Sequence, residues 1–200
     1  MLDCAGSLAG APVSEPEPND PLEAGLRIAR AFEQHGVPYA LGGALAYGVW
    51  AVPRATVDVD VNVFVADAEL GPVFDAFTSL GIPVERGVAE RAATERGLFV
   101  LRWGLYPIDV FTPSIDFSWE AARTRVAHEI EGQRYYFLSA EALAVFKLLF
   151  FRGKDITDLE RLLAVQGSRL DRAYIRRALV EMMGEDDARV RKWDELAAAG

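Results

Sequence analysis

The segment 57–63 alternates valine with polar residues, and it constrains the fold more than any other part of the chain. Side chains alternate across a β-strand, so Asp58, Asp60 and Asn62 are expected on one face and the valines on the other. The valine face is suited to packing in a core. The pattern therefore predicts a strand with one apolar face and one face that carries two neighbouring carboxylates.

The carboxylates of Asp58 and Asp60 repel each other unless a cation neutralises them. Mg²⁺ prefers oxygen ligands, and proteins hold it through one or two carboxylates while substrate phosphates complete its coordination. Mn²⁺ is the alternative ion. The competing interpretation is a half-exposed strand whose outer face is acidic without binding metal, because Asp-x-Asp alone is a weak motif.

A glycine turn lies upstream of this strand. Tyr39–Leu41 is predicted to be a short apolar strand, Gly42-Gly43 a turn, and residues 44–51 a helix that ends near Pro53. Such a turn lets the backbone approach a phosphate and presents N–H groups at the positive end of the helix dipole. Tight packing is the alternative reason for two glycines. Turn and carboxylates together predict a metal-dependent nucleotidyl transfer site.

These motifs resemble those of the polymerase-beta-like nucleotidyltransferase superfamily, and most of all those of AbiE-type toxins and their relatives. The resemblance is carried by Gly42, Gly43, Arg54, Thr56, Asp58 and Asp60. It implies an α+β nucleotidyltransferase fold, in which a small mixed β-sheet is flanked by helices and followed by a C-terminal helical segment. It also implies a third metal-binding carboxylate on a later strand, which Asp109 in the segment 106–111 would provide.

By this resemblance, Asp58, Asp60 and Asp109 bind the metal, while Gly42, Gly43, Arg54 and Thr56 bind the nucleotide. Arg54 has an alternative role in a salt bridge to Asp58 or Asp60.

The AbiE-type toxins also carry a lysine on a later helix, followed by an Arg-x-x-Asp-like segment. Lys147 and the segment 152–159 match that order. Lys147 is predicted either to pair with phosphate or carboxylate, or to extend its charge from an apolar surface to solvent. Asp155 fits a helix N-cap equally well. Asp158 is the functional candidate of the segment, where it would orient Lys147 or the acceptor.

The predicted activity is Mg²⁺-dependent transfer of a nucleoside monophosphate from a nucleoside triphosphate to an acceptor hydroxyl. The resemblance implies an RNA 3′ end, particularly that of tRNA, in a toxin–antitoxin setting with an antitoxin protein as partner. Transfer to a small molecule such as an antibiotic is one alternative. A noncatalytic, nucleotide-binding regulatory protein is the other.

The charge distribution bears on the acceptor. The net charge is −9, which disfavours nonspecific binding to nucleic acid, yet residues 147–177 hold 8 basic and 4 acidic residues. Four arginines in this region are candidates for RNA contact: Arg169, Arg172, Arg176 and Arg177. An ordinary solvated helix face is the alternative.

The chain of 200 residues is expected to comprise a disordered tail at 1–18, a nucleotidyltransferase core at 19–138 and a helical part at 139–200 packed on the core. No apolar run reaches membrane-spanning length, and the N-terminal residues lack the order of a signal peptide. The expected location is cytoplasmic, with no membrane contact. The single cysteine, Cys4, excludes an internal disulfide.

Capping residues and periodicity predict further elements. A helix should begin at Asp20-Pro21 and another at Asp67, while residues 87–97 are ambiguous. Two antiparallel strands are predicted at 98–103 and 106–111, and a third near 135–138. Helices are predicted at 139–151, 155–165, 171–183 and 185–198. The helical spacing of Phe146, Phe150 and Phe151 favours the core, with a base-stacking platform as the alternative, and His35 and His128 are expected at the surface or at caps.

Overall fold

The structure is a computed structural model that describes residues 16–199. Six segments pair into one sheet: β1 (Tyr39–Leu41), β2 (Val59–Val63), β3 (Leu98–Trp103), β4 (Tyr106–Phe111), β5 (Val126–Ile130) and β6 (Gln133–Phe137). The strands lie in the order β3-β4-β2-β1-β6-β5. The pairs β2–β4 and β1–β6 are parallel and the other pairs are antiparallel, so the sheet is mixed.

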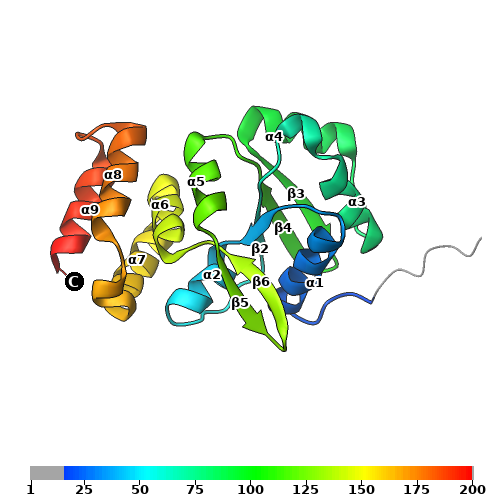
Figure 1. Cartoon of the computed structure of the whole chain (residues 1–200), viewed down its shortest axis with the longest axis horizontal. Coiled ribbons are helices and arrows are strands. Elements are labelled where there is room, and N and C mark those ends of the chain that lie inside the picture. Colours follow the sequence, from blue (N-terminus) through cyan, green and yellow to red (C-terminus); the bar gives the residue numbers. More distant parts are fainter. Residues whose placement is uncertain (1–15, 200) are drawn as a thin grey trace, which may run out of the picture.

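Within the same residues the α-helices are α1 (Pro21–Gln34), α2 (Gly43–Trp50), α3 (Gly71–Ser79), α4 (Arg86–Arg96), α5 (Asp116–Thr124), α6 (Ala140–Phe150), α7 (Gly153–Gln166), α8 (Arg172–Met183) and α9 (Ala188–Ala199). Two short 3-10 turns, η1 (Asp67–Glu69) and η2 (Gly167–Arg169), precede α3 and α8. Helices flank the sheet, and α6 to α9 gather at the end of the molecule opposite α1 and α3 (Figure 1). The predicted fold class is confirmed. None of the helices described is long and apolar enough to cross a membrane.

Helix α1 forms as its capping residues predict. The Asp20 side chain accepts a hydrogen bond from the backbone N–H of Glu23, and Pro21 occupies the first turn, where its missing N–H costs nothing. Its fully buried residues Ile28 and Phe32 lie on the face that packs against β1 and β2. Capping and amphipathicity together therefore fix this helix on one side of the sheet.

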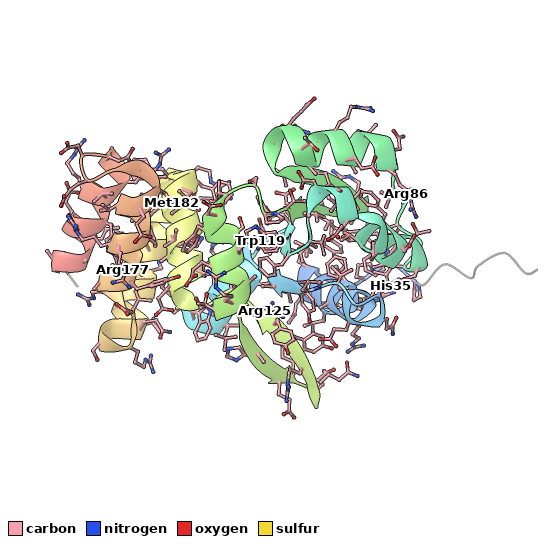
Figure 2. All side chains as sticks on the ribbon, turned by 45° about the horizontal axis from the view of Figure 1, so that its top comes forward. His35, Arg86, Trp119, Arg125, Arg177 and Met182 are labelled. Carbon is pink, nitrogen blue, oxygen red and sulfur yellow. The ribbon has the colours of Figure 1, made fainter. Side chains whose placement is uncertain are left out.

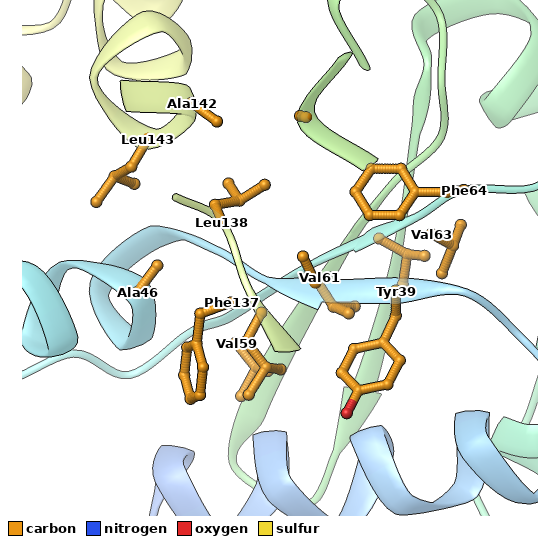
Figure 3. Packing of buried hydrophobic residues seen from close by; sticks show 14 of the residues in the cluster. Tyr39, Ala46, Val59, Val61, Val63, Phe64, Phe137, Leu138, Ala142 and Leu143 are labelled. Atoms are coloured by element: carbon orange, nitrogen blue, oxygen red, sulfur yellow. The ribbon is translucent and has the colours of Figure 1, made fainter. Parts of the chain in front are cut away.

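The valine face of β2 provides the centre of the core. Val59, Val61 and Val63 are buried, as the alternation predicts. Figure 3 shows Val59 and Phe137 on the side of the sheet that faces α1, drawn in blue. The strand begins only at Val59, however. Val57 is 70% exposed and does not contribute to the core.

The register of β2 and β4 brings the candidate site residues together on the opposite face of the sheet. Asp60 is paired with Asp109, and Asn62 is paired with Phe111. Because alternate residues share a face, these four side chains form two adjacent rows on the same side. The two aspartates, which lie far apart in the sequence, are therefore direct neighbours across a parallel strand pair.

The glycine turn joins β1 to α2 beside these rows. The N–H of Gly42 donates a hydrogen bond to the backbone carbonyl of Asp60, at 2.9 Å. Gly43 has a φ of +47°, a conformation that L side chains rarely adopt. A Cβ atom at position 43 would overlap the carboxylate of Asp60. The second glycine is thus needed both for the backbone turn and for the close approach of this carboxylate.

Several predicted boundaries were wrong. The expected tail extends to residue 18, and its residues 1–15 lie outside the described part, but Pro18 is buried and the Pro16 carbonyl accepts a hydrogen bond from Arg27. Asp67 begins the turn η1 and is not the cap of α3. The region 87–97, which was left ambiguous, is almost all within α4. Residues 116–124 and 126–130 form α5 and β5, which the sequence analysis did not identify.

The turn generates a first prediction. We expect Gly43→Ala to lower the free energy of unfolding by about 1 kcal/mol from backbone strain alone, and further because the Asp60 side chain must move. Gly36→Ala is the matched control, because Gly36 also has a positive φ of +67° but has open space around its missing Cβ. Denaturant unfolding of both variants measures the difference. Equal losses would show that Asp60 does not pack against the turn.

Candidate active site

One pocket of about 380 Å³ opens on the acidic face of the sheet. Residues Gly43, Asp58, Asp60 and Asp109 contribute its sheet-side wall, and Lys147 on α6 lies across from them. The basic residues Arg54, Arg152 and Lys154 line the same pocket. The structure thus brings together residues from β2, β4, the glycine turn and the α6–α7 junction.

The three carboxylates act on one another electrostatically. Burial and, after it, the charges of Asp58 and Asp109 raise the pKa of Asp60 from its ordinary 3.8 to about 6. The pKa of Asp109 is likewise raised, first by burial and then by Asp58. Within residues 16–199, neither the Asp60 nor the Asp109 carboxylate forms a side-chain hydrogen bond or ion pair that would offset this repulsion. The negative charge of Asp60 and Asp109 is therefore not neutralised by any directly bonded side chain within these residues.

Oxygen donors of this kind fit a hard divalent cation such as Mg²⁺ or Mn²⁺. The raised pKa values agree with that fit, because a cation would stabilise the ionised carboxylates. Among the residues described, however, no three acidic, histidine or cysteine side chains are already arranged as a set of metal ligands. The donor set is thus suitable in chemistry but not preformed in geometry.

Thr56 contacts one of the three carboxylates, that of Asp58. Its hydroxyl donates a short hydrogen bond to the carboxylate of Asp58, which holds that side chain just before β2 begins. Thr56 itself is not among the residues that line the pocket. Its direct contact is therefore with Asp58.

Arg54 has a partner that the sequence analysis did not identify. Its Nε and Nη2 atoms donate to the two carboxylate oxygens of Asp158, at 3.2 and 3.1 Å. The alternative of a salt bridge to Asp58 or Asp60 was wrong. Two parallel hydrogen bonds of this type hold both planar groups in a fixed orientation. Arg54 consequently ties the loop after α2 to helix α7.

Lys147 is buried rather than extended to solvent. It is 5% exposed, and its Nζ lies 2.6 Å from a carboxylate oxygen of Asp158 and 3.7 Å from one of Asp155. The ring of Tyr47 lies beneath, with its centroid 5.4 Å from Nζ. The ammonium group therefore lies between two buried acids and an aromatic face, and the snorkelling alternative was wrong.

Asp158 is the centre of this ion-pair cluster. Burial opposes its ionisation, but hydrogen bonds from Arg54 and Lys147 outweigh that effect and lower its pKa. Asp155 is 1% exposed, and its carboxylate accepts from the backbone N–H and the side chain of Arg152. Asp155 is the third residue of α7 and not its N-cap, since α7 begins at Gly153. We call Arg54, Lys147, Arg152, Asp155 and Asp158 the ion-pair cluster.

Arg152 and Lys154 are two pocket residues that were not singled out from the sequence. Both are exposed and both line the pocket. Their positive charges offset part of the rise that burial and Asp58 cause in the pKa of Asp109. Lys154 has no ion pair within the described residues. The sequence does show two basic residues between Phe151 and Asp155. Only the junction of α6 and α7 places them in the same pocket as the carboxylates.

The four arginines considered for RNA contact do not line this pocket. Arg176 pairs with Glu185 and Asp194, Arg172 donates to the Ala197 carbonyl, and Arg169 donates to the Val165 carbonyl. Arg177 lies on α8, within the helical end of the molecule (Figure 2). Arg172 and Arg176 thus connect α8 to α9 and the turn before it, whereas Arg169 and Arg177 are exposed and contact residues close by in the sequence.

Two assignments of aromatic residues also need correction. Phe150 and Phe151 are 47% and 37% exposed, so they are not core residues. The His128 ring contacts Trp50 and Phe137, so it is only partly exposed and belongs to a small aromatic cluster. His35 does lie at the C-terminal cap of α1, where its Nδ1 contacts the Ala31 carbonyl.

No protein-family model matches the chain, and comparison with curated proteins finds no match. The solution structure of the antibiotic-resistance factor ANT(2'')-Ia matches with a TM-score of 0.52 and 17% sequence identity, over 87% of this chain and 87% of that chain. The crystal structure of ANT(2'')-Ia in complex with adenylyl-2''-tobramycin gives a TM-score of 0.55 at 17% identity, over 78% of this chain and 95% of that chain. These matches show that the chain has a nucleotidyltransferase fold.

The raised pKa of Asp60 predicts how pH affects the metal-free protein. Its pKa in the folded state, about 6, exceeds the ordinary 3.8, so the proton stabilises the folded state and this contribution is lost as pH rises through 6. We expect Asp60→Asn to stabilise the protein by about 1–3 kcal/mol near pH 8 and much less near pH 4.5. Denaturant unfolding in EDTA measures this. If Asp60→Asn is no more stable than the wild type near pH 8, repulsion among the three carboxylates does not destabilise the folded protein.

The ion-pair cluster yields a prediction on stability. Lys147→Met should lower the free energy of unfolding by about 3 kcal/mol, because two buried acids lose a shared cation. Lys154→Met is the control; it removes the charge of an exposed lysine and should change stability by at most about 0.5 kcal/mol. The comparison uses denaturant unfolding near pH 7. Equal stability of the wild type and Lys147→Met would show that Arg54 and Arg152 suffice to neutralise both acids.

Proposed function

We propose that the protein transfers a nucleoside monophosphate from a nucleoside triphosphate to an acceptor hydroxyl. The observation that carries the proposal is the pairing of Asp60 with Asp109 across β2 and β4, beside Asp58 and the Gly42-Gly43 turn, in one pocket. A nucleotidyltransferase fold supplies the general context.

Asp58, Asp60 and Asp109 would hold Mg²⁺, with Mn²⁺ as the alternative. When bound, the metal would neutralise the triphosphate and stabilise the leaving pyrophosphate. The repulsion among the three carboxylates supports this assignment, because it disappears only when positive charge enters the site.

The chain's own residues would bind and orient the substrate. The backbone at Gly43 and Ala44 lines the pocket at the first turn of α2, where N–H groups and the helix dipole favour phosphate. Lys154 and Arg152 are the exposed cations that face the carboxylates, so they are better placed than the buried Lys147 to contact the triphosphate. Lys147 and Asp158 would act as positioning residues that hold α6, α7 and Arg54 around the pocket.

In the transfer step, the acceptor oxygen forms a bond to the α-phosphorus while the bond from that phosphorus to the bridging oxygen breaks, which releases pyrophosphate. Asp109 would accept the hydroxyl proton, and its raised pKa favours that role. Positioning and electrostatic stabilisation would supply most of the rate enhancement.

A small hydroxylated compound is the acceptor that the structure supports best. None of the four arginines proposed for RNA contact lines the pocket, and Arg172 and Arg176 already bond to other groups of the C-terminal part. One structural neighbour is an antibiotic-resistance factor solved with an adenylylated tobramycin. Transfer to an antibiotic-like molecule is therefore the first candidate.

An RNA 3′ end is the second candidate, and the observation that favours it is the exposure of Arg96, Arg152 and Lys154 around the pocket. Such cations attract phosphates of an RNA end. tRNA as the acceptor, an antitoxin partner and a toxin–antitoxin setting belong to this second candidate.

The activity is tested with nucleoside triphosphates labelled at the α-phosphate, incubated with protein, Mg²⁺ and either total RNA or a panel of aminoglycosides. We expect label to enter one acceptor class, and Asp58→Asn, Asp60→Asn and Asp109→Asn each to reduce transfer at least about a hundredfold. Asp67→Asn is the matched control, because Asp67 lies outside the pocket. Thermal unfolding should show that the three inactive variants stay folded.

Label in the aminoglycosides supports the first acceptor and label in RNA supports the second. Transfer at the wild-type rate by any of the three pocket variants would place the chemistry elsewhere. Absence of label in either class with all four triphosphates would contradict the proposed reaction for these acceptors.

A further inference from the structure

The pocket also has an aromatic wall, which we define as Phe111, Phe146 and Phe150. Phe146 and Phe150 lie four residues apart on α6 and so share one helix face. The rings of Phe111 and Phe150 are in contact, with centroids 5.8 Å apart and planes inclined by 62°. The aromatic wall therefore connects β4 to the end of α6, on the same face of the sheet as Asp60 and Asp109.

Phe150 is not required there by core packing. It is 47% exposed, although it lines the pocket and an exposed phenylalanine loses the benefit of burial. The guanidinium carbon of Arg152 lies 4.7 Å from the centroid of its ring. The aromatic wall is thus directly next to the basic side of the pocket.

Asn62 is the polar side chain next to the aromatic wall. It is 8% exposed, it lines the pocket, and its β4 partner is Phe111 of the aromatic wall. Its side chain forms no hydrogen bond with any other residue of the part that the structure describes. Its polar atoms are not among the fully buried, unpartnered ones in that part of the chain, so the carboxamide is open to the pocket and can bond a ligand that supplies a donor and an acceptor.

We propose that the aromatic wall and Asn62 bind the nucleobase of the triphosphate, with the base packed on the wall and its polar edge hydrogen-bonded to Asn62. The inference rests on the proposed function and adds which residues select the substrate. A flat ring with a polar edge matches an aromatic surface beside one carboxamide, whereas phosphate groups match the basic residues of the pocket. Phe150 supplies affinity, and Asn62 discriminates between bases.

The test compares nucleotides with inorganic tripolyphosphate, which has the same phosphates but no base. Isothermal titration calorimetry of the full chain with Mg²⁺ measures the affinity for tripolyphosphate and for each of the four nucleoside triphosphates. We expect Phe150→Leu to weaken all four nucleotides about tenfold, because stacking does not depend on the base. The affinity for tripolyphosphate should not change.

Phe151→Leu is the matched control. Phe151 adjoins Phe150 and is 37% exposed, but it does not line the pocket, so this variant should bind every ligand as the wild type does.

Asn62→Leu should act differently from Phe150→Leu. We expect the wild type to prefer one base and this variant to bind all four nucleotides within about threefold of one another, because the discriminating hydrogen bonds are lost. Unchanged tripolyphosphate affinity would show that the site is folded. If Asn62→Leu does not fold, Asn62→Ser removes the same contact with less change in polarity.

The outcomes separate this inference from the proposed function. If the wild type binds neither nucleotide nor tripolyphosphate, both fail. If it binds nucleotide and tripolyphosphate equally well, or if Phe150→Leu weakens both to the same degree, only the base subsite is overturned. Equal affinity of the wild type for all four nucleotides would overturn the role of Asn62.

Discussion

The repulsion between Asp60 and Asp109 is the constraint on which the site depends. Parallel pairing of β2 and β4 places these two carboxylates directly opposite each other, and Asp58 adds a third negative charge. The apolar face of the same strands makes this arrangement stable, because Val59 and Val61 are fully buried on the other side of the sheet. The fold thus supplies the free energy that holds three acids together in the absence of a cation.

Positive charge surrounds these acids without pairing with them. Arg54, Lys147 and Arg152 are each bound to an acid of helix α7, which leaves Asp60 and Asp109 to a ligand. Because Arg54 and Asp158 are 104 residues apart in sequence, their contact also fixes the helical end of the molecule against the loop that precedes β2. One cluster of ion pairs therefore shapes the pocket and keeps its carboxylates available.

Features set by neighbouring residues could be predicted from the sequence. The alternation of valine and polar residues identified β2, and the Asp20 and Ser139 caps identified the starts of α1 and α6. The glycine turn could be placed as well, since a φ of +47° at Gly43 is a local requirement. Residues 58, 60 and 109 were brought together as expected, although their role in metal binding is still a proposal.

Features set by long-range contacts could not be predicted in the same way. The sequence suggested only the nearby acids at 58 and 60 as ion-pair partners of Arg54, whereas its partner in the structure, Asp158, is 104 residues away. Phe150 has the helical spacing of a core residue, and only the position of α6 over the pocket shows why it is exposed. Lys154 was missed because its significance depends on how α6 and α7 meet.

Direct observation of the metal gives the sharpest test of the account. Electron paramagnetic resonance can measure free Mn²⁺ during titration of the protein with a nonhydrolysable nucleoside triphosphate present. We expect the wild type to bind Mn²⁺ together with the nucleotide, and Asp109→Asn to weaken Mn²⁺ binding at least about tenfold. Equal Mn²⁺ affinity of the wild type and a variant with asparagine at positions 58, 60 and 109 would contradict the central claim.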